Sequence, residues 1–299
     1  MPLVSFRELM ANAEQGGYAV GYFESWNLES LLAVADAAEA TRSPVILGFS
    51  GLSLPDPSRI VKDKLEPYAA MGLAVCRGLS VPACFLFNES PFIRWVWQAI
   101  DLGFNMVMFS DDELDPPEQE EVIREVVGRA RPLGIAVEAE MVSVPGVHGG
   151  LTAVPANLQL TEPPAAAAFV RRTGVDALAV NIGQAHVHGR VELNLDLDRL
   201  AALREAVSVP LVLHGATSVG SEDLAEAARL GIRKINVGSA IKRAYFEAVR
   251  RASIQAGDQY NSYAVVGSGL AVDVEAAGRI AMRAVVEDLM RLFGSSGKA

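Results

Sequence analysis

Short apolar segments recur eight times along the chain, and this regular recurrence is the feature that most restricts its fold. Each segment holds four to seven residues, most of them aliphatic or β-branched, and polar stretches separate them. Short runs that are apolar at nearly every position are typical of strands buried on both faces. The eight segments span residues 18–23, 44–50, 83–89, 104–110, 136–141, 177–182, 210–214 and 234–237.

The stretches between these segments carry apolar residues at helical spacing, as at 28–40, 116–130, 197–207 and 221–230. Several begin at a capping residue such as Asn27 or Ser221, and end at a glycine such as Gly134 or Gly231. Eight strand–helix units in about 250 residues predict a closed (β/α)8 barrel (TIM barrel), since open parallel sheets usually have fewer strands. No glycine-rich dinucleotide loop follows the first segment, so a doubly wound sheet is not favoured.

Two helical regions are expected outside the eight units. Residues 6–17 predict an extra N-terminal helix that closes the bottom of the barrel. Residues 262–294 carry a long apolar pattern at helical spacing and predict a C-terminal helical arm. The arm has two open placements, on a second subunit or on its own barrel. We expect one domain over residues 1–299.

Composition restricts the partners. The sequence has 36 acidic and 26 basic residues and a formal charge of −10, which offers nucleic acid no basic surface. Cys76 and Cys84 lie in apolar surroundings, as reduced thiols of intracellular proteins do. The N-terminal residues show no signal pattern, and no apolar run approaches the roughly 20 residues that span a bilayer. We expect a cytoplasmic protein that binds small molecules, with no membrane partner.

Two of the four histidines suggest a metal site. His186 and His214 stand just past the sixth and seventh segments, at the end of the barrel where active sites form. Imidazole suits a borderline divalent ion, and catalytic sites commonly use three protein ligands. Glu89, at the end of the third segment, or Glu140, at the end of the fifth, would complete a set suited to Zn, Mn, Fe or Co.

The other two histidines are weaker candidates. His188 lies on a loop with no strand to direct it, which favours a solvated or indirect role. His148 lies in a glycine-rich loop that would be able to close over the mouth of the barrel.

Glycines and hydroxyl residues follow the last two segments and indicate a phosphate site. Barrels often bind phosphate there through backbone N–H groups, hydroxyls and a helix N-terminus. Arg190 would add a bidentate contact. A metal ion beside such a site predicts a phosphorylated ligand whose carbonyl oxygen the ion polarises. The candidate phosphate-binding residues are Gly215, Thr217, Ser218, Gly238 and Ser239.

None of the five lysines stands at a predicted strand exit. Lys234 falls at the entrance of the eighth segment, which we expect to lie far from the mouth. Catalysis through a Schiff base is therefore not expected.

Seven segments of the sequence, spread in order over nearly the whole chain, resemble the class II, metal-dependent ketose-bisphosphate aldolases. The resemblance implies a homodimeric or homotetrameric barrel in which zinc polarises the carbonyl of a ketose phosphate. It further implies cleavage of fructose or tagatose 1,6-bisphosphate into dihydroxyacetone phosphate and an aldehyde. The segments are 4–9 (VSFREL), 16–23 (GGYAVGYF), 43–48 (SPVILG), 137–140 (VEAE), 174–179 (GVDALA), 210–215 (PLVLHG) and 234–237 (KINV).

By this resemblance, His186 and His214 match the family's second and third zinc histidines, and Glu140 matches the glutamate near its metal. Asn236 matches a substrate-contacting asparagine, and Arg190 matches the cation after the second histidine. Ser50, at the exit of the second segment, joins the substrate-binding candidates.

The departures from the family fall on residues that carry its chemistry. Asn88 and Glu89 stand where the family has an aspartate and its first zinc histidine. Glu89 would replace a histidine as a ligand, but an asparagine does not transfer protons as a carboxylic acid does. Asp111 or Asp112 would have to substitute, and His148 falls near the family's proton-moving glutamate.

Three functions stay open on these residues. The first is a metal-dependent carbon–carbon lyase that acts on a phosphorylated ketose, with the choice between fructose 1,6-bisphosphate and another ketose left open. The second is a metal-dependent sugar-phosphate isomerase or epimerase that stabilises the same enediolate. The third is a metabolite-binding protein that keeps the barrel without catalysis.

Overall fold

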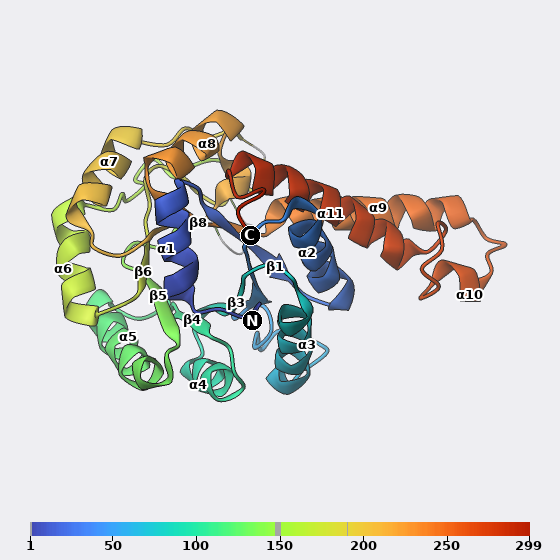
Figure 1. Ribbon diagram of the computed structural model, residues 1–299, viewed down its shortest axis with the longest axis horizontal. Coiled ribbons are helices and arrows are strands. Elements are labelled where there is room, and N and C mark those ends of the chain that lie inside the picture. The colour runs from blue at the N-terminus through green and yellow to red at the C-terminus, as the bar shows by residue number, and fades with distance from the viewer. Residues whose placement is uncertain (1, 147–150, 190) are drawn as a thin grey trace.

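Eight parallel strands close into a barrel in the computed structural model, which describes residues 2–146, 151–189 and 191–299 (Figure 1). Each strand pairs with its neighbours in chain order, and β8 closes the barrel on β1 with Tyr22 opposite Asn236. The predicted (β/α)8 barrel is confirmed, and every predicted strand segment overlaps one strand. The strands are β1 (Val20–Ser25), β2 (Val45–Ser50), β3 (Ala83–Ser90), β4 (Met106–Phe109), β5 (Ala136–Glu140), β6 (Ala177–Ala179), β7 (Leu211–Leu213) and β8 (Ile232–Val237).

Helices on the outside of the barrel begin and end where local chemistry favours it. Asn27 and Ser30 form a capping box at the start of α2, and Asp115 accepts a hydrogen bond from the Glu118 N–H at the start of α5. The helices are α1 (Phe6–Gly16), α2 (Leu28–Thr41), α3 (Leu65–Gly78), α4 (Ile93–Asp101), α5 (Pro116–Ala130), α6 (Pro163–Thr173), α7 (Leu197–Ala206), α8 (Ser221–Leu230), α9 (Ser239–Ala256), α10 (Ser262–Val265) and α11 (Val274–Leu292), with 3-10 turns η1 (Arg131–Leu133) and η2 (Ala216–Ser218).

The core has two main parts. One fills the space between the strands and the outer helices. The other fills the lower barrel interior, where Phe6, Leu9 and Met10 of α1 pack against inward-facing residues such as Ile46 and Leu86. The N-terminal helix therefore closes the bottom of the barrel, as predicted, and the opposite end is left for the site.

The C-terminal helices divide their contacts between the barrel and solvent. Met282, Val286 and Met290 of α11 are buried, and Phe293 stacks on Phe23 of β1 with ring centroids 6.4 Å apart. The C-terminal part of α9, the short α10 and the start of α11 extend away from the barrel (Figure 1). In this projecting part Tyr263 is 91% exposed.

The remaining expectations at this level concern cysteines and membranes. Cys76 and Cys84 are both free thiols in the core. Among the helices that the structure describes, none combines the length and the apolar character needed to cross a bilayer.

Candidate active site

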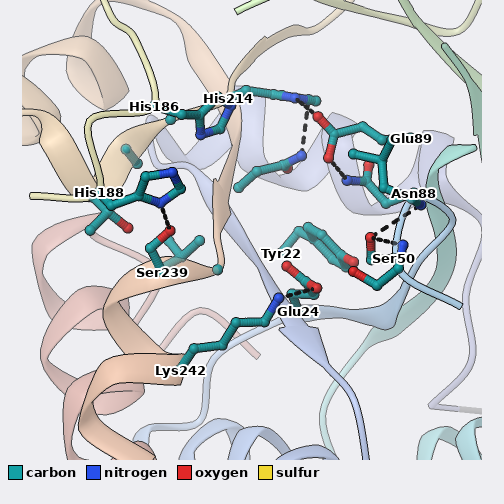
Figure 2. A pocket seen from close by; sticks show the side chains of 18 of the residues that line it. Tyr22, Glu24, Ser50, Asn88, Glu89, His186, His188, His214, Ser239 and Lys242 are labelled. Carbon is teal, nitrogen blue, oxygen red and sulfur yellow. Dashed lines mark hydrogen bonds and ion pairs between the residues drawn. The ribbon is translucent and has the colours of Figure 1, made fainter. Parts of the chain in front are cut away.

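A cavity of about 760 Å³ opens at the carboxyl ends of the strands. β1 contributes Tyr22 and Glu24, and β2 ends at Ser50. Figure 2 shows how these side chains face the histidines across the cavity. The sequence-predicted residues that line it are Ser50, Asn88, Glu89, His186, His214, Gly215, Thr217, Asn236, Gly238 and Ser239.

His214 lies at the centre of the polar contacts in this cavity. Its Nδ1 is 2.9 Å from Glu89 Oε1, and its Nε2 is 2.8 Å from Glu138 Oε1. Asn236 Nδ2 also lies 2.9 Å from Nε2. Burial disfavours the charged ring, but the two carboxylates outweigh burial and raise the pKa of His214 to about 10. The two carboxylates thus favour the protonated ring of His214.

Glu89 reaches the cavity because the β3 strand is irregular at this point. The pairing of β3 with β4 shifts between Phe87 and Ser90, and Glu89 has φ +52°, which is uncommon for a residue with a side chain. Neighbouring residues of a regular strand point to opposite faces, whereas Asn88 and Glu89 both line this cavity. The irregularity thus directs a carboxylate toward His214.

Asn88 holds the second oxygen of Glu89. Its Nδ2 donates a hydrogen bond of 2.6 Å to Glu89 Oε2. Burial opposes ionisation of Glu89, but the charge of His214 and its hydrogen bond outweigh it and lower the pKa of Glu89 to about 2. The carboxylate is charged throughout the physiological range.

Glu138 and Lys234 form a buried ion pair beneath His214. Lys234 Nζ lies 2.8 Å from Glu138 Oε2, and both side chains are fully buried. Lys234 does not line the cavity, but its ammonium contacts residues that reach the site, which the sequence did not predict. It shares the inward face of β8 with Asn236, two residues on, and its long side chain lets the ammonium reach Asn236 Oδ1 at 2.5 Å. Glu138, two residues before Glu140, was not predicted to contact a histidine.

His186 differs from His214 in its surroundings. Its ring makes no hydrogen bond with the residues that the structure describes, and burial lowers its pKa to about 4. It is a neutral imidazole at pH 7, the form that binds metal ions.

The donor types around this cavity suit a divalent ion, but their arrangement does not. Two imidazoles and one carboxylate are ligands that Zn²⁺ accepts. Both ring nitrogens of His214 are engaged by carboxylates, however, and a charged imidazolium has no free lone pair for a metal. Within residues 2–146, 151–189 and 191–299, no three His, Cys, Asp or Glu side chains form a metal-ligand group. An ion held by His186, His214 and Glu89 would therefore replace the contact between His214 and Glu89.

Glu140 lies apart from the two histidines, in a neighbouring cavity of about 400 Å³. Ser110 Oγ donates a hydrogen bond of 2.5 Å to Glu140 Oε1. Burial raises the pKa of Glu140 to about 7, and the nearby charges of Glu89 and Asp112 add to the effect against an opposing contribution from His214. Asp112 lines the same neighbouring cavity and accepts a hydrogen bond from Ser143 Oγ.

The raised pKa of Glu140 predicts how Glu140→Gln changes stability with pH. Below pH 4.5 both the folded and the unfolded chain hold the proton, so Glu140 adds no pH dependence. Between pH 4.5 and 7 the unfolded chain releases it first, so the free energy of unfolding falls as pH rises, by about 3 kcal/mol in total. Glutamine does not ionise, so the free energy of unfolding of the Glu140→Gln variant does not fall over this pH range for this reason.

We therefore expect the Glu140→Gln variant to be more stable than the wild type at pH 8.5, by about 2 kcal/mol after allowing for a weaker contact with Ser110. At pH 4 it should be equal or slightly less stable. Urea unfolding in chelator at both pH values measures this, with Glu113→Gln at the exposed lip as the control. An equal difference between Glu140→Gln and wild type at both pH values would contradict the raised pKa.

Cations and hydroxyls gather at the opposite end of the larger cavity. His188 Nδ1 is 2.6 Å from Ser239 Oγ, and His188 Nε2 is 3.1 Å from the Gly146 carbonyl oxygen. His188 lines the cavity, and its contact with Ser239 is compatible with the predicted solvated or indirect role, which stays a prediction. Lys242 and Arg243, near the start of α9, line it as well.

These cations are held by neighbouring groups. Lys242 Nζ pairs with Glu24 Oε1 at 2.6 Å, and the Arg243 guanidinium donates to the His188 carbonyl oxygen. Thr217 Oγ1 accepts from the Ala240 N–H at 3.2 Å. Ser218 lies behind the cavity wall, where its Oγ accepts a hydrogen bond from the Gly189 N–H. Two predicted site residues, His148 and Arg190, lie outside the residues that the structure describes.

The family model described as "Fructose-bisphosphate aldolase class-II" matches residues 4–298. The chain therefore belongs to the class II fructose-bisphosphate aldolase family, whose members are lyases and generally depend on a divalent metal ion.

Individual relatives match along their whole length. The fructose-bisphosphate aldolase of Geobacillus stearothermophilus is 33% identical over 302 residues, which cover 100% of this chain and 99% of that protein. The sulfofructosephosphate aldolase of Alkalicoccus urumqiensis is 30% identical over 300 residues, with the same coverage of each. The crystal structure of the YdjI aldolase from Escherichia coli K12 aligns with a TM-score of 0.80 at 31% identity and covers 99% of both chains.

Proposed function

We propose that this chain is a divalent-metal-dependent aldolase that cleaves a phosphorylated ketose into dihydroxyacetone phosphate, or a similar ketone, and an aldehyde. One observation carries the proposal. A single cavity holds two histidines and a carboxylate at one end and an anion-binding set of cations and hydroxyls at the other. Membership of the aldolase family supports it.

The phosphate would bind where α9 begins. Ser239 and Thr217 supply hydroxyls, Lys242 and Arg243 supply charge, and the α9 N-terminus adds the partial positive charge of its free N–H groups. Gly215 and Gly238 leave the backbone open to close approach. Arg190 stays a predicted contact.

The proposed ion is Zn²⁺, with Mn²⁺, Fe²⁺ or Co²⁺ as alternatives, and its proposed ligands are His186, His214 and Glu89. When bound, such an ion polarises the substrate carbonyl and stabilises the enediolate. Because His214 and Glu89 are bonded to each other, ion binding requires His214 to lose its proton and leave Glu89. Glu140 stays an alternative ligand, although Glu138 is the carboxylate that contacts His214 from β5.

In the cleavage direction, the bond between C3 and C4 of the ketose breaks, the C4 hydroxyl loses its proton to leave an aldehyde, and C3 gains a proton. Asn88 would orient the reacting oxygen through its amide, since it does not transfer protons. His148 and Asp112 stay the predicted proton carriers.

We further infer that the protein is a cytoplasmic homodimer or homotetramer. The sugar-phosphate substrate supports the location, and the exposed apolar residues of the projecting arm support the assembly. Val266, Leu270 and Ile280 are each more than half exposed there. Exposure of several apolar side chains to water is unfavourable, and such surfaces often mark contacts between subunits.

Proton exchange tests the proposed function. Metal-replete protein in D₂O should exchange a hydroxymethyl proton of dihydroxyacetone phosphate, followed by NMR, at least about 100-fold faster than chelated protein. The physical reason is that the enediolate forms only where its negative charge is stabilised. No exchange with any divalent ion would leave the metabolite-binding protein as the account of this chain.

A further inference from the structure

The lysine and the arginine that line the larger cavity within the described residues lie on one side of it, across from the His214–Glu89 pair. Among the described residues that line the larger cavity, Lys242, Arg243 and His188 cluster around the start of α9 with Ser239. This cluster offers hydrogen-bond donors and positive charge to one phosphate, and Lys242 is also paired with Glu24 at 2.6 Å. One end of a ketose phosphate would bind at this cluster, and the other end would contact the remaining walls of the cavity.

The neighbouring cavity, which shares Leu52, Asp56 and Glu89 with the larger one, has walls of the opposite character. No lysine, arginine or histidine lines it within the part of the chain that the structure describes. Six carboxyl groups line it, from Asp56, Glu89, Asp111, Asp112, Glu113 and Glu140. Among the described residues that line this cavity, the ionisable groups that a phosphate, sulfonate or carboxylate would meet are carboxyl groups, which disfavour a second anion.

Two neutral polar atoms at the floor of the larger cavity point independently to the kind of group that this end binds. Tyr22 Oη and Asn88 Oδ1 have no hydrogen-bond partner, although both residues line the cavity and are at most 3% exposed. Buried polar atoms without partners are rare in folded proteins. Figure 2 shows both residues on the Glu89 side, away from Ser239.

These two atoms complement an alcohol. The Tyr22 hydroxyl keeps its proton, because burial and the nearby carboxylates raise the pKa of Tyr22 well above its usual range, so it is able to donate. Asn88 Oδ1 only accepts, since its amide nitrogen is bonded to Glu89. A substrate hydroxyl both accepts and donates, so the hydroxyls of a polyhydroxylated chain satisfy both kinds of atom.

We propose that the enzyme takes a ketose monophosphate: one phosphate binds at the start of α9, and the aldehyde half is an uncharged polyhydroxylated chain that extends past Tyr22 and Asn88 toward the carboxylate-lined cavity. The proposal rests on the proposed function and specifies its substrate class. Selectivity then has two physical sources, which are hydroxyl recognition by neutral groups and repulsion of a second anion.

Matched aldehyde pairs test this proposal in the condensation direction. Dihydroxyacetone phosphate is combined with glyceraldehyde or with glyceraldehyde 3-phosphate, and with erythrose or with erythrose 4-phosphate. We expect kcat/KM to favour the unphosphorylated member of each pair by at least about tenfold. Equal values, or a preference for the phosphorylated member, would overturn the proposal.

Charge reversal at the lip of the acidic cavity separates electrostatic exclusion from poor fit. Glu113→Lys should shrink the preference for the unphosphorylated aldehyde about fivefold, because it adds a cation where the second phosphate would lie. Glu125→Lys, an exposed position on α5 that lines neither cavity, is the matched control and should leave the preference unchanged. The same shift in both variants, or in neither, would contradict repulsion by this cavity.

Exchange of dihydroxyacetone phosphate protons, measured on the same samples, distinguishes the two levels of failure. That half-reaction needs no aldehyde. Normal exchange with a preference for phosphorylated aldehydes overturns the monophosphate proposal alone. Absent exchange overturns the proposed function, and the monophosphate proposal with it.

Discussion

Replacing Lys234 by methionine should lower the free energy of unfolding by about 3 to 5 kcal/mol. Lys234 and Glu138 are both fully buried and 2.8 Å apart, so the variant leaves a carboxylate inside the barrel without its main counter-charge. The hydrogen bond from His214 to Glu138 remains, which favours the lower end of this range. Urea unfolding of the metal-free protein measures the change.

Lys242→Met is the matched control, because it removes the same charge from an ion pair in which Lys242 is 43% exposed. We expect a change within about 1 kcal/mol there. Adding Glu138→Gln to Lys234→Met should recover part of the lost stability, since the remaining buried group is then neutral. Equal losses for Lys234→Met and Lys242→Met would contradict the buried pair.

The barrel could be predicted from the sequence because its main determinants are local. Each buried strand is a short apolar run between capped helices, and this pattern is visible without knowing which strands pair. Such local patterns predicted the C-terminal helical arm but did not predict whether it packs on its own barrel or on a second subunit. Apolar spacing identifies a helical face, but α11 packs on its own barrel through Met282 and Met290 while Ile280 stays exposed.

The strand-exit rule brought candidate residues to the correct end of the barrel but did not identify their partners. It selected Glu140 on β5, whereas Glu138 contacts His214. Two residues apart on one strand, both face inward, so strand parity does not choose between them. The choice depends on which layer of the barrel His214 and Lys234 reach, and that requires the closed structure.

Lys234 is a residue that the strand-exit rule left out although it contacts the site. Its Cα lies in the lower half of β8, and only the length and direction of its side chain bring the ammonium to Glu138 and Asn236. The available signal was the spacing of Lys234 and Asn236, which places both on the inward face of one strand. The irregularity that turns Glu89 toward His214 has no signal in the sequence that we can name.

Release of dihydroxyacetone phosphate from a ketose 1-phosphate tests the central claim most directly. Metal-replete protein should release it at least about 1,000-fold faster than chelated protein, because the enediolate left by C3–C4 cleavage needs its charge stabilised. His186→Ala should lose the activity to a similar degree. Since the His186 ring forms no hydrogen bond with the described residues, this variant is expected to fold, and its unfolding curve provides the control.

The account predicts release of dihydroxyacetone phosphate from at least one ketose 1-phosphate, stopped by chelator and restored by Zn²⁺ or a similar ion. Proton exchange without release of dihydroxyacetone phosphate from any ketose phosphate would contradict it, and would identify the chain as an isomerase or epimerase instead of a lyase.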